Sequence, residues 1–323
     1  MKLLLILDPP ASLKSYKDTS LAIMREAAAR GHTLYVCEQH DVFLRNEVVK
    51  INAKKFTFSS SLGDNQSNSE VWFNVDHAEE VLPKIFDAIL MRKDPPFDNE
   101  YLYSTYLLEL AASQGARVLN NPVAIRSWNE KLSVAKFPQF APEFLVTANN
   151  ALIREFLATH KDIVIKPLDG MGGNGIFRIH EYDHNIGVIL ETATQFGRQT
   201  IMAQRYLPAI LQGDKRIIVI NGEPLPYALA RIPKAGETRG NLAAGGTGVA
   251  QPLSTRDLEI AMTVGKALKV EGLFLVGLDV IGDYLTEINV TSPTGMVEIT
   301  AQTLHLNLPC NAAQIFVEAL EKI

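Results

Sequence analysis

The sequence predicts an α/β fold followed by an α+β fold in one chain of 323 residues. Over the first 120 residues, short apolar runs alternate with amphipathic segments, which is typical of β-α-β units around a mostly parallel sheet. From Glu143 onward the pattern changes to strand pairs with few intervening helices. Because single cores rarely grow past roughly 250–300 residues, we expect more than one domain.

Four apolar runs of the first region predict strands at Leu3–Leu7, Thr33–Cys37, Ala88–Met91 and Ala116–Leu119. Amphipathic segments that stop at a glycine predict helices at Thr19–Arg30 and Asn99–Gln114. Residues 48–74 carry Ser, Asn and Gly without clear periodicity, so we expect a surface excursion there. A turn at Asn120–Pro122 should end the region, before a helix over about 124–136.

The second region contains apolar and alternating runs that predict strands at Ile163–Leu168, Ile176–His180, Thr200–Tyr206, Arg216–Ile220, Leu225–Ile232, Phe274–Ile281 and Leu285–Val290. One long helix interrupts this series. Ser254 is its expected N-cap, and Asp257 takes the capping-box position three residues later.

Composition excludes several classes of protein. The net charge of −5 and the pI near 5.8 argue against a nucleic-acid binder. Cys37 and Cys310 are the only cysteines and form no CxxC pair, so we expect neither a disulfide scaffold nor a cysteine-ligated zinc site. The apolar run at the N-terminus is too short for a signal peptide, and no run reaches the roughly 18 residues of a membrane span. We therefore expect a cytoplasmic protein that binds neither membrane nor nucleic acid.

Residues 169–176 read DGMGGNGI and match the GxGxxG pattern. A dinucleotide fingerprint requires a helix directly after the glycines, whereas IFRIH here alternates like a strand. We interpret the segment as a glycine-rich hairpin that covers ATP phosphates, and the plain alternative is a flexible turn. Lys166 could reach the same phosphates from the strand end or could be a solvated edge residue, and Lys131 gives a weaker signal. No Walker A motif occurs.

The hairpin at residues 273–291 interrupts two apolar strands with oxygen-bearing side chains, Asp279, Glu287 and Asn289. Glu287 and Asn289 are two residues apart, so they leave the same face of a strand, and such hard oxygen ligands suit Mg²⁺. A two-residue turn at Gly282–Asp283 would place Asp279 opposite Thr286. We therefore predict an odd-numbered loop such as 282–284, which places Asp279 opposite Glu287. The alternative is a solvated outer face with scattered acids.

The segment at residues 232–246 is long and glycine-rich and has Arg239 near its middle. It is either a lid that brings Arg239 toward a phosphoryl group or a mobile surface loop. Arg216 and Arg231 interrupt strands, where they could be edge charges or part of a cationic lining for polyphosphate. No histidine spacing suited to a metal and no GxSxG elbow occurs.

Three motifs are specific to one family: RKDPPFD (92–98), KPLDGMGG (166–173) and ETRGNLAAGG (237–246). With them the chain resembles the bacterial glutathione synthetases, which are ATP-grasp ligases, and the likeness covers nearly its whole length. Further matching segments are YKDTS (16–20), NEK (129–131), MAQRYLP (202–208), GDKR (213–216) and VGLDVIGDYLTEINVTSPTG (276–295). The metal triad alone would indicate only ATP-grasp.

The resemblance implies an N-terminal parallel-sheet (pre-ATP-grasp) domain at 1–122 and a two-lobed ATP-grasp domain. Its first lobe would span 123–206 with the glycine-rich flap, and its second 207–323 with the metal site and lid. The implied reaction is the ATP-dependent ligation of γ-L-glutamyl-L-cysteine with glycine through an acyl phosphate, giving glutathione, ADP and phosphate. Family members are commonly tetramers, so a homo-oligomer is expected.

The resemblance also implies roles for individual residues. The nucleotide would be held by Lys131, Lys166, Gly170, Gly172, Gly173, Gln204, Arg205, Tyr206, Leu207 and Asp214. Mg²⁺, with Mn²⁺ as an alternative, would be bound by Asp279, Glu287 and Asn289. The catalytic residues facing the transferred phosphoryl group would be Arg216, Arg231 and Arg239. Asp18, Arg92 and Ser292 are candidates for gripping the peptide substrate. Thr247 stands where some relatives have arginine, residues 300–311 do not align clearly, and no general base is evident.

Two other functions compete with this interpretation. A D-alanine–D-alanine or glutamate ligase of the same fold would share the metal hairpin, but the RKDPPFD motif speaks against it. A non-catalytic ATP-binding protein would keep the fold without turnover. Retention of the metal residues together with Arg216 and Arg239 argues against that alternative.

Overall fold

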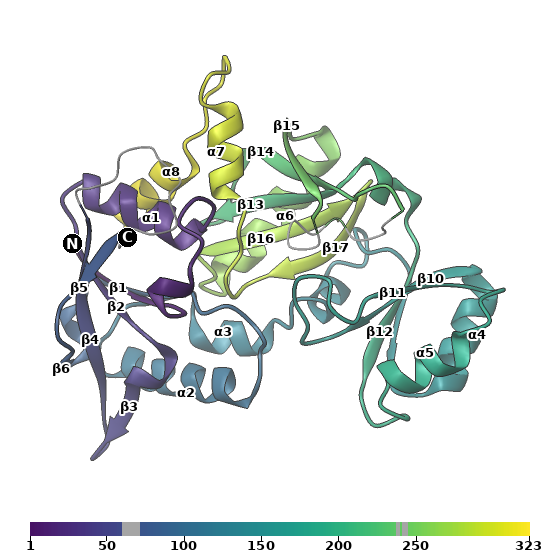
Figure 1. The fold of residues 1–323 in the computed structure, drawn as a ribbon, viewed down its shortest axis with the longest axis horizontal. Coiled ribbons are helices and arrows are strands. Elements are labelled where there is room, and N and C mark those ends of the chain that lie inside the picture. The colour runs from purple at the N-terminus through teal and green to yellow at the C-terminus, as the bar shows by residue number, and fades with distance from the viewer. Residues whose placement is uncertain (60–71, 237–239, 241–244) are drawn as a thin grey trace.

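The computed structural model describes residues 1–59, 72–236, 240 and 245–323, which form three sheets with helices packed around them (Figure 1). The predicted class is confirmed, with a mixed sheet first and two antiparallel sheets after it. Within the described residues no helix is long and apolar enough to cross a membrane.

The first sheet has eight strands in the order β3-β4-β2-β1-β7-β8, and β5 and β6 pair with β4. They are β1 (Lys2–Ile6), β2 (Thr33–Cys37), β3 (Val42–Arg45), β4 (Val48–Phe58), β5 (Phe73–Val75), β6 (Glu79–Val81), β7 (Ala88–Met91) and β8 (Val118–Leu119). Strands β2, β1, β7 and β8 are parallel, as predicted, and β4 runs antiparallel to β2. The helices of this region are α1 (Thr19–Ala29), α2 (Asn99–Ser113) and α3 (Pro122–Ser127).

The predicted surface excursion at 48–74 is wrong for its first part. Residues 48–58 form β4, whose alternate residues Val49, Ile51 and Ala53 are buried in the first sheet. This alternation gives the strand one apolar face, which burial against the core stabilises. Residues 60–71 of that excursion lie outside the described residues.

The prediction of one helix over 124–136 is also wrong, because the structure has two short helices there. Helix α3 ends at Ser127, and a 3₁₀ helix covers Leu132–Lys136. The side chain of Asn129 lies between them and accepts hydrogen bonds from the backbone N–H groups of Lys131 (3.1 Å) and Leu132 (2.9 Å). Such a local side-chain acceptor competes with the helical hydrogen bonds and starts a new turn.

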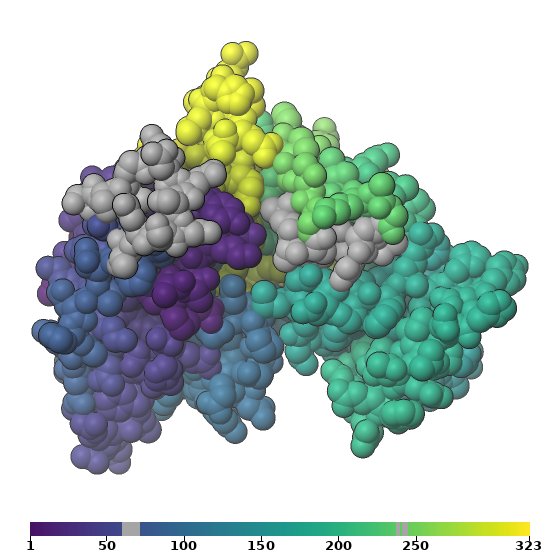
Figure 2. Space-filling model, viewed as in Figure 1, coloured from purple at the N-terminus to yellow at the C-terminus, as the bar shows by residue number. Residues whose placement is uncertain are grey.

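The second sheet has four antiparallel strands in the order β11-β10-β12-β9. They are β9 (Phe144–Thr147), β10 (Asp162–Pro167), β11 (Phe177–His180) and β12 (Ile201–Arg205), accompanied by α4 (Asn150–His160) and α5 (Ile186–Ala193). These two helices were missed in the expected strand-rich region. Their side chains and the far face of this sheet form a separate small core around Ile163, Ile165 and Leu190. This unit, the small lobe, projects from the rest of the molecule (Figure 2).

The third sheet has five antiparallel strands in the order β15-β14-β13-β16-β17. They are β13 (Asp214–Ile220), β14 (Glu223–Ile232), β15 (Thr247–Pro252), β16 (Leu275–Ile281) and β17 (Tyr284–Asn289). The long helix α6 (Thr255–Val270) begins at the predicted capping box of Ser254 and Asp257. Helices α7 (Met296–Thr303) and α8 (Ala312–Leu320) were missed, and α8 returns to pack on α1 (Figure 1). Buried residues of the first and third sheets share their cores.

Candidate active site

A cavity of about 450 Å³ lies where loops of the first sheet, the glycine hairpin and the third sheet meet. Most of the predicted site residues line it: Asp18, Lys131, Lys166, Gly170, Gly172, Gly173, Gln204, Arg205, Tyr206, Leu207, Asp214, Arg216, Arg231, Asp279, Glu287, Asn289 and Ser292. Arg92 does not line it, and Arg239 lies outside the described residues. Residues from all parts of the sequence therefore converge on one space.

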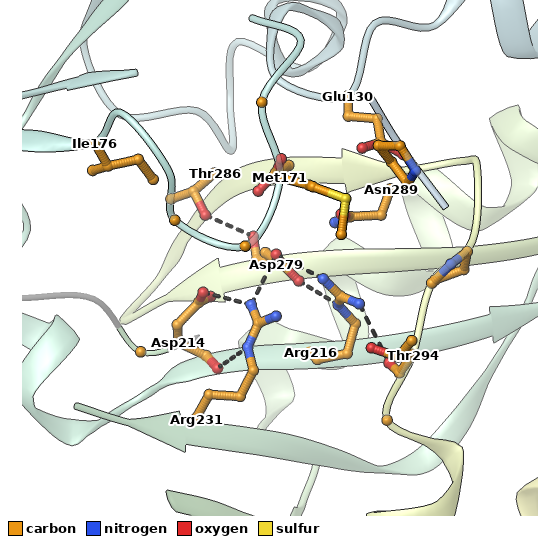
Figure 3. Close-up of a pocket in the computed structure, with 18 of the residues that line it drawn as sticks. Glu130, Met171, Ile176, Asp214, Arg216, Arg231, Asp279, Thr286, Asn289 and Thr294 are labelled. Carbon is orange, nitrogen blue, oxygen red and sulfur yellow. Dashed lines mark hydrogen bonds and ion pairs between the residues drawn. The ribbon is translucent and has the colours of Figure 1, made fainter. Parts of the chain in front are cut away.

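The predicted register of the metal hairpin is confirmed, since Asp279 pairs with Glu287 and Gly277 with Asn289. The predicted odd-numbered loop is wrong, because Ile281 pairs with Tyr284 and leaves a two-residue turn. The register shifts between Asp279 and Val280, where Thr286 is the extra residue of a β-bulge. Its hydroxyl donates to the Asp279 carbonyl oxygen at 3.1 Å (Figure 3).

Charged side chains alternate across three strands of the third sheet (Figure 3). Arg216 donates from Nε to Oδ1 of Asp279 at 2.5 Å and from Nη2 to Oδ2 at 3.0 Å. Arg231 Nη2 contacts Asp279 Oδ2 at 2.8 Å and Asp214 Oδ2 at 2.5 Å. We call Asp214, Arg231, Asp279 and Arg216 the charge ladder. All four line the cavity, so their charges meet any ligand there.

Two carboxyl groups of the charge ladder have opposite pKa shifts. Burial alone would raise the pKa of Asp279, but the guanidinium groups of Arg216 and Arg231 hold that pKa well below its usual range. Burial raises the pKa of Asp214 to about 6, although Arg231 works in the opposite direction. One Asp214 oxygen, Oδ1, has no hydrogen-bond partner among the described residues. Asp279 is therefore the firmly ionised partner of both arginines.

Lys131 connects the flap to the metal hairpin. Its Nζ donates to the Gly170 carbonyl oxygen at 2.7 Å and to Glu287 Oε1 at 2.9 Å. Burial works to lower its pKa, but Glu287 outweighs burial, so the pKa is raised and Lys131 stays charged. The flap, residues 169–176, is the predicted glycine-rich hairpin, because β10 before it and β11 after it pair antiparallel.

Lys166 lines the same cavity, and its ammonium group makes no hydrogen bond or ion pair with another of the described residues. Burial lowers its pKa. An ammonium group without a partner in a cavity is a ready site for an anionic ligand, because an anion would compensate its lost hydration.

The segment 204–207 presents both side-chain and backbone groups to the cavity. Gln204 pairs with Val164 in the neighbouring strand, so its side chain lies on the same sheet face as Lys166. Its Nε2 is buried without a partner among the described residues. The Arg205 side chain instead pairs with Glu143 at 2.6 Å. The backbone N–H groups of Arg205 and Tyr206 already donate to the carbonyl oxygens of Glu143 (2.9 Å) and Asp162 (3.0 Å). The Gln204 amide donor thus remains available for a planar polar ligand.

Loops of the first sheet close the opposite side of the cavity. Asp18 caps α1 by accepting from the Leu21 N–H at 2.9 Å, and burial raises the pKa of Asp18. Ser292 donates its hydroxyl to Asp94 at 2.6 Å. Arg92 lies behind this wall, where its Nη2 donates to the Pro293 carbonyl oxygen at 2.9 Å. The structure thus places Arg92 beneath the loop at 292–295.

Several cavity residues escaped the sequence interpretation: Lys14, Lys17, Asp94, Glu130 and Thr286. Asp94 belongs to the RKDPPFD motif and Glu130 to the NEK motif, so their closeness in sequence to Arg92 and Lys131 could have predicted a position at the cavity. Thr286 has no sequence signal, because threonine is an ordinary strand residue. Lys14 and Lys17 resemble solvated loop charges. Their position at the cavity depends on how the loop after β1 folds back.

Comparisons with known proteins agree over the whole chain. Residues 1–126 match the family model described as "Prokaryotic glutathione synthetase, N-terminal domain", and residues 130–304 match "Prokaryotic glutathione synthetase, ATP-grasp domain". The chain is 58% identical to the glutathione synthetase of Nitrosomonas europaea, over 100% of this chain and 98% of that protein. It is 55% identical to that of Neisseria meningitidis serogroup A, over 94% of each chain. The crystal structure of D-cycloserine synthetase DcsG shares the fold, with a TM-score of 0.65 and 15% identity over 99% of both chains.

Proposed function

The chain belongs to the prokaryotic glutathione synthetase family, and from this premise we propose how its cavity carries out the reaction. The activity is ATP-dependent ligation of γ-L-glutamyl-L-cysteine with glycine. We propose that nucleotide, dipeptide and glycine all bind in the 450 Å³ cavity. The charge ladder carries this proposal, because it sets two arginines and a firmly ionised carboxylate beside the flap.

The donor set of the hairpin fits Mg²⁺. Asn289 uses its Nδ2 to donate to the Gly277 carbonyl oxygen at 3.2 Å, which leaves its amide oxygen for a cation. Glu287 has one oxygen on Lys131, and its second oxygen is available to a metal. Asp279 would complete the set while holding both arginines. Mg²⁺, with Mn²⁺ as an alternative, would neutralise charge on the nucleotide phosphates.

The nucleotide would lie beneath the flap. Lys166 and Lys131 would meet its phosphates, and the positive φ angles of Gly172 and Gly173 let the backbone N–H groups turn toward them. Gln204, Arg205, Tyr206 and Leu207 would bind the adenine, with Arg205 contributing only backbone. The orphan Oδ1 of Asp214 would accept a hydrogen bond from the nucleotide.

The ligation needs an activated carboxyl group, since a carboxylate is a poor electrophile. The cysteinyl carboxylate of the dipeptide would take the γ-phosphoryl group and release ADP, which gives an acyl phosphate. The glycine amine would then attack the carbonyl carbon, lose a proton and displace phosphate. Arg216 and Arg231 would stabilise the charge that develops on the phosphoryl group and on the tetrahedral carbon. Arg239 is proposed to join them from the 232–246 lid, which would also exclude water.

Asp18 and Ser292 are proposed to contact the dipeptide from the opposite wall. Arg92 would act on the substrate through the loop that it supports.

Three further proposals concern the whole protein: a cytoplasmic location, a homo-oligomer that is a tetramer, and the division of the chain at residues 122 and 206.

Phosphate release from MgATP tests the proposal. We expect release with γ-glutamylcysteine plus glycine and little with D-alanine or glutamate as acceptor. No release with the first pair would refute the ligation. Glu287→Ala should weaken binding of ATP in the presence of Mg²⁺ and abolish turnover, whereas Glu259→Ala, which removes a surface ion pair with Arg256, should behave like the parent. Full activity of Glu287→Ala would refute the metal role.

A further inference from the structure

Three consecutive residues, Asn129, Glu130 and Lys131, join parts of the molecule that are far apart in sequence. Asn129 Nδ2 donates to the Leu168 carbonyl oxygen at 3.2 Å, just before the flap. Lys131 connects the flap to Glu287. The hydrogen bonds that Glu130, between them, makes with the described residues all go to β17 and the loop after it. We call these three residues the 129–131 junction.

Glu130 binds the end of β17 through four hydrogen bonds. Its backbone carbonyl accepts from the Ile288 N–H at 2.8 Å. Its carboxylate oxygen Oε1 accepts from the N–H groups of Val290 (2.9 Å) and Thr291 (3.1 Å) and from the Thr291 hydroxyl (2.9 Å). A single side-chain oxygen thereby fixes the direction in which the chain leaves β17.

Asn120 binds the same segment, at Val290 after the end of β17, through its side-chain amide. Its Nδ2 donates to the carbonyl oxygens of Val290 (2.8 Å) and Leu275 (2.9 Å). Its Oδ1 accepts from the N–H groups of Phe274 (2.7 Å) and Leu275 (2.8 Å). Both donors and both acceptor positions of the buried amide are therefore used. Val290 is fixed by its N–H to Glu130 and by its C=O to Asn120.

The fixed segment stands between two groups of site residues. Asn289 precedes Val290, and Glu130 lies beside Asn289 in the cavity (Figure 3). Ser292 follows Thr291 and is held by Asp94. Any change in the direction of the backbone at Val290 and Thr291 would move Asn289 and Ser292 relative to each other.

We propose that Glu130 is a positioning residue for the ligation, which holds the backbone at Val290 and Thr291 so that Asn289 and Ser292 keep their places in the cavity. The inference rests on the proposed function of this site. Glu130 acts as a hydrogen-bond acceptor with a given reach, and its negative charge is dispensable. A glutamine can accept the same hydrogen bonds, whereas an aspartate keeps the charge but is one methylene too short.

Two variants separate this role from proton transfer. Glu130→Gln keeps the acceptor and the length, and Glu130→Asp keeps the ionisable carboxylate. Positioning predicts that Gln retains most of kcat while Asp loses about 100-fold in kcat/KM, the size of loss that a misplacement of about 1 Å can cause. A general base predicts the reverse order, with an altered pH profile of kcat in Glu130→Gln.

The experiment measures phosphate release with γ-glutamylcysteine and glycine, and amide hydrogen exchange at Val290 and Thr291. Circular dichroism establishes that each variant is folded. The proposal is supported if kcat/KM of Glu130→Asp is at least tenfold below that of the parent and kcat/KM of Glu130→Gln is higher than that of Glu130→Asp. Amide exchange at the two residues should become faster only in Glu130→Asp. Any other order of activities overturns it. An inactive parent protein would instead refute the proposed function, while the exchange comparison would still test the hold on β17.

Discussion

Asp279 lies opposite Glu287 across β16 and β17, although the turn between these strands has only two residues, between the paired Ile281 and Tyr284. A regular ladder with this turn would bring Thr286 opposite Asp279 and turn Glu287 to the other face. The bulge at Thr286 absorbs one residue, so Thr286 and Glu287 both line the cavity. The chemistry of the site thus depends on a local irregularity of one strand.

Thr286→Val should loosen this bulge, because valine keeps the shape of threonine but cannot donate to the Asp279 carbonyl oxygen. We expect the free energy of unfolding to fall by about 1 kcal/mol, the usual size of one hydrogen bond. We also expect kcat/KM to fall about tenfold as Glu287 loses its register. Chemical denaturation and phosphate release measure the two effects. Thr159→Val in α4 is the control, and an equal loss of activity there would contradict the explanation.

Gly277→Ala should displace the Arg216 side chain. A Cβ at position 277 would come within 2.8 Å of Arg216 Cδ and 2.9 Å of Pro293 Cβ, both too close for real contacts. Since Arg216 holds Asp279 with two hydrogen bonds, we expect kcat to fall about 100-fold, as for loss of a positioned charge. Gly187→Ala, whose Cβ would meet only Arg154 at 3.6 Å, should leave kcat unchanged. Equal kcat values for the two variants would exclude the clash as a cause.

Asp214 should make the apo protein less stable as pH rises through about 6. Its pKa in the folded state is raised to about 6 by burial, so the folded state binds the proton more tightly than the unfolded state does. The stability from this group is complete below about pH 4 and is lost as pH rises through the folded pKa. Asp279, with its lowered pKa, stays ionised in this window.

Asp214→Asn removes this titration. Urea unfolding between pH 4.5 and 7.5, without nucleotide or metal, should show the parent losing on the order of 2 kcal/mol relative to the variant. Parallel pH curves for the two proteins would show that the Asp214 carboxyl does not titrate abnormally.

Lys131→Met should weaken nucleotide binding by releasing the flap from Glu287. Both hydrogen bonds of its ammonium group are lost, and Glu287 is left without its ion pair. We expect KM for ATP to rise more than tenfold, since hydrogen bonds to charged groups contribute about 1.5–3 kcal/mol. Lys136→Met, which removes only a contact with Trp128, is the matched control. An unchanged KM in Lys131→Met would rule out this role.

The strands could largely be predicted from the sequence because apolar runs and alternation determine which faces are buried. Strands β2 and β7 match their predicted ranges, and the other predicted strands differ by one or two residues at an end. No strand was predicted at β3, β4, β5, β6, β9 or β15. Strand β4 was missed although Val49, Ile51 and Ala53 alternate with polar residues, because Lys55 before Phe56 breaks the alternation. Helix α4 had a readable signal, since Asn149 caps it by accepting from the Ala151 N–H at 2.9 Å.

The site could be predicted in its members but not in its internal contacts. The register of Asp279 and Glu287 could be predicted because metal ligands must lie on one face of the sheet. The β-bulge that produces this register could not be predicted. Nothing local in the sequence indicates that Asp279 is shared by Arg216 and Arg231, because they come from three strands. The same applies to Glu130, whose partners lie about 160 positions further along the chain.

The separate core of the small lobe has a consequence for how the protein opens. Ile163, Ile165 and Leu190 pack within that lobe, whereas the first and third sheets share their cores. Units with separate cores can unfold at different free energies, and the unit with less buried apolar area opens more readily. A nucleotide that touches the small lobe and the third sheet at once would link their opening, so the ligand itself would make the molecule one cooperative unit.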